Sequence, residues 1–247
     1  MKIYQAIVLG AIQGLTEFLP ISSSGHLAIA TSILGVDGGL AFSVLMHFAT
    51  LIPVCVVFRK SIQTVAKSKD CIRNLIIATI PAGIVGVVFS PIIERIFSTP
   101  KILSWSFLIT ALALILSQML SKRSTKSVSK SSALVYGLFQ AVAVVPGVSR
   151  SGACLTAGRI CGVEEKENVS FAFIMSIPII LASTVFEGSK LLFASEQSIS
   201  LLPLAFGFVS ALIFGFLSAN IVKRLTKKLN YVFGVYLMIL SLILFIC

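Results

Sequence analysis

The segment that decides the fold reads Gln13-Gly14-Leu15-Thr16-Glu17-Phe18-Leu19-Pro20-Ile21-Ser22-Ser23-Ser24-Gly25-His26. It places an acid, several hydroxyls and an imidazole inside an otherwise apolar stretch. A charged side chain at membrane depth costs about 2.5–3.5 kcal/mol on insertion scales, so this cluster predicts a functional site. Gln13 and Glu17 are four residues apart and share one face of a helix. Pro20 ends that helix, and the serines after it are N-cap candidates for a second, short helix.

A second polar interruption reads Pro146-Gly147-Val148-Ser149-Arg150-Ser151-Gly152. The two interruptions are copies, because at an offset of 127 residues Gly10, Gln13, Ser22, Ser24 and Gly25 align with Gly137, Gln140, Ser149, Ser151 and Gly152. Arg150 takes the place of Ser23 in this alignment, so the copies contribute different chemistry. We predict a single membrane domain over 1–247, with a first repeat at 1–125 and a second at 126–247.

Six apolar stretches are long enough to span a bilayer, which takes about 20 residues. They cover roughly 40–58, 72–93, 102–120, 168–190, 201–222 and 230–247. Backbone groups in lipid must satisfy their own hydrogen bonds, so we expect helices. The broken regions 1–35 and 132–162 each predict two half-length helices that enter the membrane and return. The predicted fold is an all-α polytopic membrane protein with six full spans plus two re-entrant helix hairpins.

Three loops hold 13 of the 20 lysines and arginines, and the positive-inside rule predicts that all three are cytoplasmic. They carry Arg59, Lys60, Lys67, Lys69 and Arg73; Lys122, Arg123, Lys126 and Lys130; and Lys223, Arg224, Lys227 and Lys228. Both termini and residues 35–39, 94–101 and 191–200 are then expected outside. Three membrane-spanning helices follow each hairpin. Because three is an odd number, the second repeat enters the membrane in the opposite orientation to the first. Such an inverted-topology repeat predicts a site between the repeats near the midplane.

The composition also indicates a membrane protein. Hydrophobic residues make up 57% of the 247 residues and charged residues 12%, about half of the roughly 25% charge of soluble domains. The net charge of +11 lies in short loops, so we expect contacts with the lipid bilayer and no nucleic-acid partner. The five cysteines lack CxxC spacing, and we expect neither a disulfide nor a cysteine metal site. The apolar N-terminal stretch lacks a typical cleavage site and is expected to stay on the protein.

The residues at the two interruptions favour phosphate chemistry. Helix N-termini bind anions through backbone N–H groups and the helix dipole, and Arg150 can bind phosphate oxygens in a bidentate manner. The nucleophile is either Ser23 with His26 as its base, or a water activated by His26 or Glu17. Glu17 is alternatively a ligand for Mg²⁺ or Ca²⁺, with Gln13 as a weaker neutral ligand. A phosphoserine intermediate and direct hydrolysis both stay open.

Plainer interpretations compete at several other positions. His47 is predicted to be a structural polar residue within its span. Glu187, near the outer end of its span, is either a plain interfacial residue or a functional one. Arg159 either snorkels to the inner interface or supports the site. The loop acids are most simply a solvated turn: Glu164, Glu165 and Glu167.

The two interruptions resemble the signature motifs of the undecaprenyl-diphosphate phosphatase family, the bacitracin-resistance type of bacterial lipid-carrier phosphatase. Gln13 and Glu17 match the first family motif, (E/Q)xxxE, and residues 146–151 match the second, PGxSRSxxT. The final threonine position of the second motif falls on Cys154, so this chain lacks the family hydroxyl there. The likeness covers essentially the whole chain in span pattern and length.

The resemblance implies a reaction, a cofactor and a set of site residues. It implies removal of the terminal phosphate from undecaprenyl diphosphate, recycling the carrier for cell-wall synthesis and conferring bacitracin resistance. It places the active site toward the outer face of the bacterial inner membrane. It implies a divalent cation, Mg²⁺ or Ca²⁺, and is compatible with a homodimer. By position, the catalytic residues are Glu17, Ser23, His26 and Arg150, the substrate-binding residues are Gln13, Ser22, Ser24, Gly147, Ser149 and Ser151, and the metal ligands are Glu17 and Gln13.

The alternative function is a lipid-carrier transporter or flippase. Inverted repeats with broken helices are a transporter architecture, and histidine or glutamate side chains can relay protons. Simple transport does not require a serine, histidine, glutamate and arginine together at the breaks, which favours the phosphatase. A membrane scaffold would leave the buried charges unexplained.

Overall fold

The structure is a computed structural model, and it describes residues 1–36, 39–89, 92, 100–120, 126–191, 200–224 and 227–246. These residues form helices joined by short turns, with one isolated β-bridge between Lys126 and Val163. The predicted all-α class is therefore confirmed. In chain order the helices are α1 (Ile3–Phe18), α2 (Ser23–Leu34), α3 (Gly39–Val57), α4 (Arg59–Ala66), α5 (Lys69–Val88), α7 (Pro100–Leu120), α8 (Lys130–Val142), α9 (Arg150–Ile160), α10 (Glu165–Ile174), α11 (Ser176–Leu191), α12 (Leu201–Lys223) and α13 (Lys227–Ile246).

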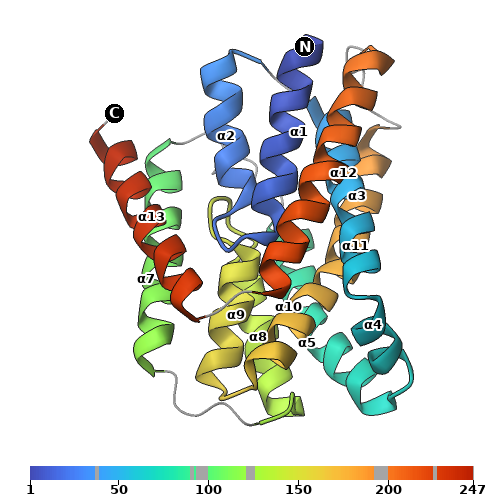
Figure 1. The fold of residues 1–247 in the computed structure, drawn as a ribbon, viewed down its shortest axis with the longest axis vertical. Coiled ribbons are helices and arrows are strands. Elements are labelled where there is room, and N and C mark those ends of the chain that lie inside the picture. The colour runs from blue at the N-terminus through green and yellow to red at the C-terminus, as the bar shows by residue number, and fades with distance from the viewer. Residues whose placement is uncertain are drawn as a thin grey trace.

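The two interruptions form the tips of two helix hairpins. Figure 1 shows α1 and α2 side by side in the upper half of the molecule and α8 and α9 in the lower half, with the tips near mid-height. Helix α1 ends at Phe18 because Leu19, directly before Pro20, is extended (φ −64°, ψ 144°), as a residue before proline prefers. The polar segments of the sequence thus lie in the middle of the molecule.

Several helices can cross a membrane. Four segments are long and apolar enough, namely Lys69–Val88, Lys101–Met119, Glu165–Ser189 and Leu201–Lys223. Helices α3 and α4 provide a fifth crossing if counted as one span, although the chain bends by 78° between them. The stretch Asn230–Ile246 of α13 is apolar but shorter. The chain is therefore a multi-pass membrane protein.

Two predicted spans differ locally from continuous helices. The span expected at 40–58 ends at Val57, where the basic and amphipathic α4 turns away as an interfacial helix does. The span expected at 168–190 is interrupted at Met175, between α10 and α11. Pro178, in the first turn of α11, has no N–H to bond the carbonyl of Ile174, so the hydrogen-bond ladder breaks there.

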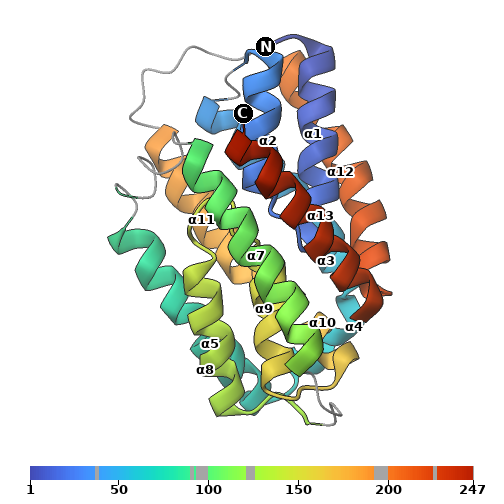
Figure 2. The same ribbon diagram turned by 90° about the vertical axis from the view of Figure 1, so that its left-hand side faces the viewer.

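The helix bounds repeat with the period seen in the sequence. Helices α1, α2 and α7 begin at residues 3, 23 and 100, and α8, α9 and α13 begin at 130, 150 and 227, which is 127 residues later in each case. Helices from opposite halves pack together, α1 along α12 and α8 along α5. Figure 2 shows α5 beside α8 and α7 beside α13. The halves are therefore interlocked.

Glycines allow these helices to approach closely at equivalent positions. A Cβ atom on Gly10 of α1 would collide with the carbonyl oxygen of Gly207 in α12. A Cβ atom on Gly137 of α8, its partner in the repeat, would lie 3.0 Å from the carbonyl oxygen of Ala78 in α5. Small residues at such crossings are typical of membrane helices.

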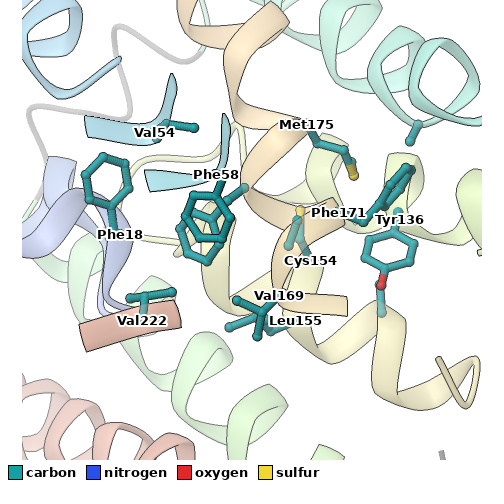
Figure 3. Packing of buried hydrophobic residues seen from close by; sticks show 14 of the residues in the cluster. Phe18, Val54, Phe58, Tyr136, Cys154, Leu155, Val169, Phe171, Met175 and Val222 are labelled. Carbon is teal, nitrogen blue, oxygen red and sulfur yellow. The ribbon is translucent and has the colours of Figure 1, made fainter. Parts of the chain in front are cut away.

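A buried aromatic cluster supports the tip of the first hairpin. Phe18, the last residue of α1, packs edge-on against Phe173 of α10, with ring centroids 5.9 Å apart. Phe58 stacks on Phe173 at 5.3 Å. Figure 3 shows Phe18 and Phe58 among the buried side chains of this core. Because Glu17 directly precedes Phe18, this packing fixes the backbone that carries the acid.

Some sequence predictions fall outside the described residues. These are Lys122 and Arg123, most of the outer segments 94–101 and 191–200, and Cys247. The repeat boundary between 125 and 126 adjoins the same undescribed stretch. The other cysteines are free thiols: Cys55, Cys71, Cys154 and Cys161.

Candidate active site

An ion pair joins the two hairpin tips. Glu17, at the end of α1, accepts from Arg150, at the start of α9, with Oε1 2.5 Å from Nη2. The two side chains are only 5% and 17% exposed. A buried carboxylate is stable only when it is paired and hydrogen-bonded. The two residues that the sequence singled out for charge therefore compensate each other.

Two further side chains bind the same carboxylate. Ser23 donates its hydroxyl to Oε2 of Glu17 at 2.7 Å, and Gln13 donates its amide to that oxygen at 3.1 Å. Both carboxylate oxygens of Glu17 are thus engaged. The other amide atom of Gln13, Oε1, is buried without a hydrogen-bond partner.

The turn before α2 is strained. Ser22 has φ +70° and is the one non-glycine residue with positive φ in the described part of the chain. Its hydroxyl accepts from the backbone N–H of Gly25 at 3.4 Å and so caps α2. Unusual backbone angles of this kind persist where the surroundings fix them, and they cluster at functional sites. The turn aims the N-terminus of α2, and with it Ser23, at Glu17.

The turn before α9 has an equivalent cap and an additional anchor on α7. The hydroxyl of Ser149 accepts from the backbone N–H of Gly152 at 3.1 Å. The backbone N–H of Ser149 donates to Thr110 of α7 at 3.0 Å. Gly147 has φ +86° and lies so close to α7 that a Cβ atom would approach Ser106 to 2.7 Å. These contacts hold Arg150 at the first position of α9.

Two hydrogen bonds lock the hairpin tips together. The backbone N–H of Gly147 donates to the hydroxyl of Ser24 at 3.3 Å. Ser151 donates to the carbonyl of Leu19 at 3.0 Å. The first residues of α2 and α9, Ser23 and Arg150, both bind the Glu17 carboxylate, so the two helix N-termini begin beside it, and their dipoles favour an anion there.

His26 lies one turn along α2 from Ser23, but its ring nitrogens hydrogen-bond to groups other than Glu17, Ser23 and Arg150. Nδ1 is 2.7 Å from the carbonyl oxygen of Ser22, and Nε2 is 2.7 Å from the hydroxyl of Tyr236 in α13. The structure therefore brings Gln13, Glu17, Ser23 and Arg150 into one network and places His26 beside it. Sequence reasoning missed Tyr236, whose only signal was a polar atom within an apolar span. It also missed Thr110, which has the same weak signal.

The remaining candidates have structural partners. The Cys154 thiol, at the motif's threonine position, is buried 3.9 Å from Oε1 of Gln140 in α8. Arg159 does not snorkel; its side chain is fully buried and pairs with Glu165 at 2.5 Å. Glu167 accepts from the backbone N–H of Val128 at 3.0 Å. The acids at 164–167 are thus more than the solvated turn predicted from the sequence.

Comparison with known proteins finds relatives over nearly the whole chain. The sequence model of the family described as "Bacitracin resistance protein BacA" matches residues 6–243. An "Undecaprenyl-diphosphatase" of Thermosipho africanus is 39% identical over 250 residues, covering 97% of this chain and 98% of that protein. One of Parabacteroides distasonis is 37% identical over 266 residues, with 100% and 98% coverage. A third, of Methanococcus maripaludis, is 35% identical over 249 residues, with 96% and 97% coverage.

Proposed function

The chain belongs to the bacitracin resistance protein BacA family, and from this premise we propose that it is a membrane phosphatase that converts undecaprenyl diphosphate to undecaprenyl phosphate and inorganic phosphate. One observation carries the assignment of the site. At the tips of the two hairpins, a serine hydroxyl and an arginine both bind one mostly buried carboxylate. This set can bind a phosphate, supply a nucleophile and remove its proton.

Arg150 and the two helix N-termini are the proposed binding site for the diphosphate. A guanidinium group has five N–H donors, so Arg150 can keep its bond to Glu17 and still bind phosphate oxygens. The diphosphate also gains from the positive ends of the dipoles of α2 and α9. The polyprenyl chain of the substrate is expected to lie in the bilayer beside the helices.

Ser23 is the proposed nucleophile. Its Oγ would attack the terminal phosphorus while its proton passes to Oε2 of Glu17, 2.7 Å away. The bond from that phosphorus to the bridging oxygen would break, and the lipid monophosphate would leave. Water would then cleave the phosphoserine. In the competing route a water takes the place of Ser23 as nucleophile, and acid-quenched reactions with substrate labelled in its terminal phosphate separate the two routes.

A divalent cation fits the donor set. Gln13 presents a buried, unpartnered oxygen next to the carboxylate of Glu17. No group of three or more His, Cys, Asp or Glu side chains forms a complete metal site within the described residues. Mg²⁺, however, is commonly held by one or two carboxylates together with substrate phosphates. As the alternative to its role as proton acceptor, Glu17 would hold Mg²⁺ or Ca²⁺ together with Gln13 and the diphosphate, and the ion would neutralise phosphate charge.

The decisive experiment is phosphate release from a polyprenyl diphosphate by the purified protein in detergent. We expect release by the wild type, a strong loss in Ser23→Ala and Arg150→Met, and inhibition by EDTA that added Mg²⁺ or Ca²⁺ reverses. Ser131→Ala, in an exposed part of α8, is the matched control. Full activity in Arg150→Met would overturn the assignment of the site. Carrier movement across liposomes without phosphate release would favour the transporter.

The active site is proposed to open toward the outer face of the inner membrane. The exposed cations of α4, Arg59 and Lys60, then lie at the cytoplasmic surface. An impermeant maleimide should label Ser200→Cys but not Ser127→Cys in intact cells. Labelling of Ser127→Cys from outside would reverse the orientation. A homodimer stays a prediction, which light scattering in detergent tests.

A further inference from the structure

The hydrogen bonds of His26 define which ring nitrogen carries its proton. Nδ1 faces the carbonyl oxygen of Ser22 at 2.7 Å, and a carbonyl can only accept. Nδ1 is therefore the protonated nitrogen of the neutral ring. Nε2, 2.7 Å from the hydroxyl of Tyr236, must then accept, and Tyr236 donates. A residue 210 positions away thus completes the hydrogen bonding of a histidine at the site.

Aromatic contacts reinforce this arrangement. The ring of His26 meets Phe107 of α7 edge-on, with centroids 5.4 Å apart. It stacks with Tyr236, with centroids 5.8 Å apart and planes inclined by 19°. Figure 2 shows α7 and α13 side by side, and the contact residues of α7 and α13 confirm this pairing. The two helices thus supply both rings that orient the imidazole.

Helix α13 is itself anchored near its start. With the amide of Asn230 oriented so that its oxygen faces α9, that oxygen accepts from both terminal nitrogens of Arg159, at 3.0 Å from Nη1. Asn230 is fully buried, whereas Tyr236 is 42% exposed. Helix α13 packs along α7, and this hydrogen bond ties its start to α9, the helix that begins with Arg150.

We propose that Tyr236 is a positioning residue of the active site. Its hydroxyl donates to Nε2 of His26 and so fixes the orientation of the imidazole ring. His26 lies three residues from Ser23 on one face of α2, so this hydrogen bond fixes the tautomer and orientation of the imidazole next to the nucleophile, and Nε2 would accept a proton from the water that cleaves the phosphoserine after exchanging the Tyr236 hydroxyl for that water. This inference rests on the proposed function. It makes α13 the third element of the site, beside the two hairpins.

Nuclear magnetic resonance tests the hydrogen bond without any activity. The chain has only two histidines, so protein labelled with ¹⁵N-histidine in detergent micelles gives two sets of ring signals, and His47→Asn assigns them. We expect His26 to show a protonated Nδ1 and an unprotonated, hydrogen-bonded Nε2. Tyr236→Phe keeps the ring but removes the donor, so the Nε2 signal should move while Nδ1 stays protonated. An unmoved Nε2 signal would overturn the inference.

Kinetics test the consequence for the reaction. Tyr236→Phe should lower kcat by about 10-fold or more with little change in KM, since a poorly held base loses part of its usual 10²–10⁴-fold contribution. In a His26→Ala background the same substitution should change kcat by less than about 2-fold, because the two residues act as one unit. Tyr231→Phe, at an exposed tyrosine of the same helix, is the matched control. Equal losses in both backgrounds would show that Tyr236 does not act through His26.

These readouts separate the two proposals. A wild-type protein that releases no phosphate but shows the expected Nε2 signal would overturn the phosphatase and leave the pairing intact. A working phosphatase in which Tyr236→Phe alters neither signal nor kcat would overturn only the inference.

Discussion

Glu17 and Arg150, 133 residues apart in the chain, form one buried ion pair between the tips of the two hairpins. The pair has two separable roles. It neutralises charge inside the protein, which stabilises the fold. It also holds a guanidinium on the carboxylate that binds the Ser23 hydroxyl, which is the arrangement proposed for the reaction.

The first prediction separates these two roles. Arg150→Met leaves Glu17 as an uncompensated buried charge and should lower the free energy of unfolding by about 3–5 kcal/mol. The double variant Glu17→Gln with Arg150→Met removes both charges and should recover most of that loss. Phosphate release should stay reduced by more than about 100-fold in both. Denaturant unfolding in detergent and the phosphate assay measure the two effects, and recovery of activity in the double variant would contradict the catalytic role.

A second prediction compares two adjacent serines. Ser23 donates to Glu17, whereas Ser24 accepts from the backbone of Gly147 and lies 3.3 Å from the hydroxyl of Ser22. Ser23→Ala should reduce phosphate release by more than about 100-fold and lower the free energy of unfolding by about 1–3 kcal/mol, because the buried carboxylate of Glu17 loses a hydrogen bond. Ser24→Ala should cost about 1 kcal/mol of stability for the lost hydrogen bond and reduce release by less than about 10-fold. The reverse order of effects would move the nucleophile from Ser23 to Ser24.

The sequence was sufficient to predict the hairpin tips and their meeting. Glu17, Ser23 and Arg150 were identifiable because polar and charged side chains are costly at membrane depth. Their presence in an apolar segment therefore indicates a function. The offset of 127 residues relates the two tips in the sequence alone. Four of the six predicted spans coincide with helices long and apolar enough to cross a membrane, although the interruption at Met175 was not foreseen despite the signal of Pro178.

Contacts between distant helices could not be predicted in this way. Thr110 and Tyr236 lie in apolar spans, where a single hydroxyl is more often a packing residue. Their roles depend on the height and rotation of α7 and α13 against the hairpins, which no local pattern encodes. The same holds for Arg159, whose full burial depends on partners in three other helices.

A third prediction concerns the backbone at the second tip. Gly147 has φ +86°, and a Cβ atom there would lie 2.7 Å from both Leu103 and Ser106. Gly147→Ala should therefore destabilise the protein by about 1–3 kcal/mol and lower phosphate release through displacement of Arg150. Gly86→Ala is the control, because a Cβ atom there meets nothing within 4 Å. Thermal unfolding should show a lower melting temperature for Gly147→Ala only. Equal melting temperatures of the two variants would contradict steric strain at Gly147.

A last prediction concerns Arg159, which the sequence left ambiguous. Its side chain is 0% exposed, pairs with Glu165 at 2.5 Å and donates to Ser117 of α7 at 3.5 Å. Arg159→Met should lower the free energy of unfolding by about 3–5 kcal/mol, because Glu165 loses its partner. Arg73→Met should cost less than about 1 kcal/mol, since its ion pair with Asp70 is exposed to solvent.

The location of Arg159 adds a second readout to that comparison. Arg159 also binds Asn230 at the start of α13, so its loss should loosen the helix that carries Tyr236. The Nε2 signal of His26 should then shift in Arg159→Met in the same direction as in Tyr236→Phe, while Arg73→Met leaves it unchanged. A destabilised Arg159→Met protein with an unchanged His26 signal would mean that α7 alone holds α13 in place.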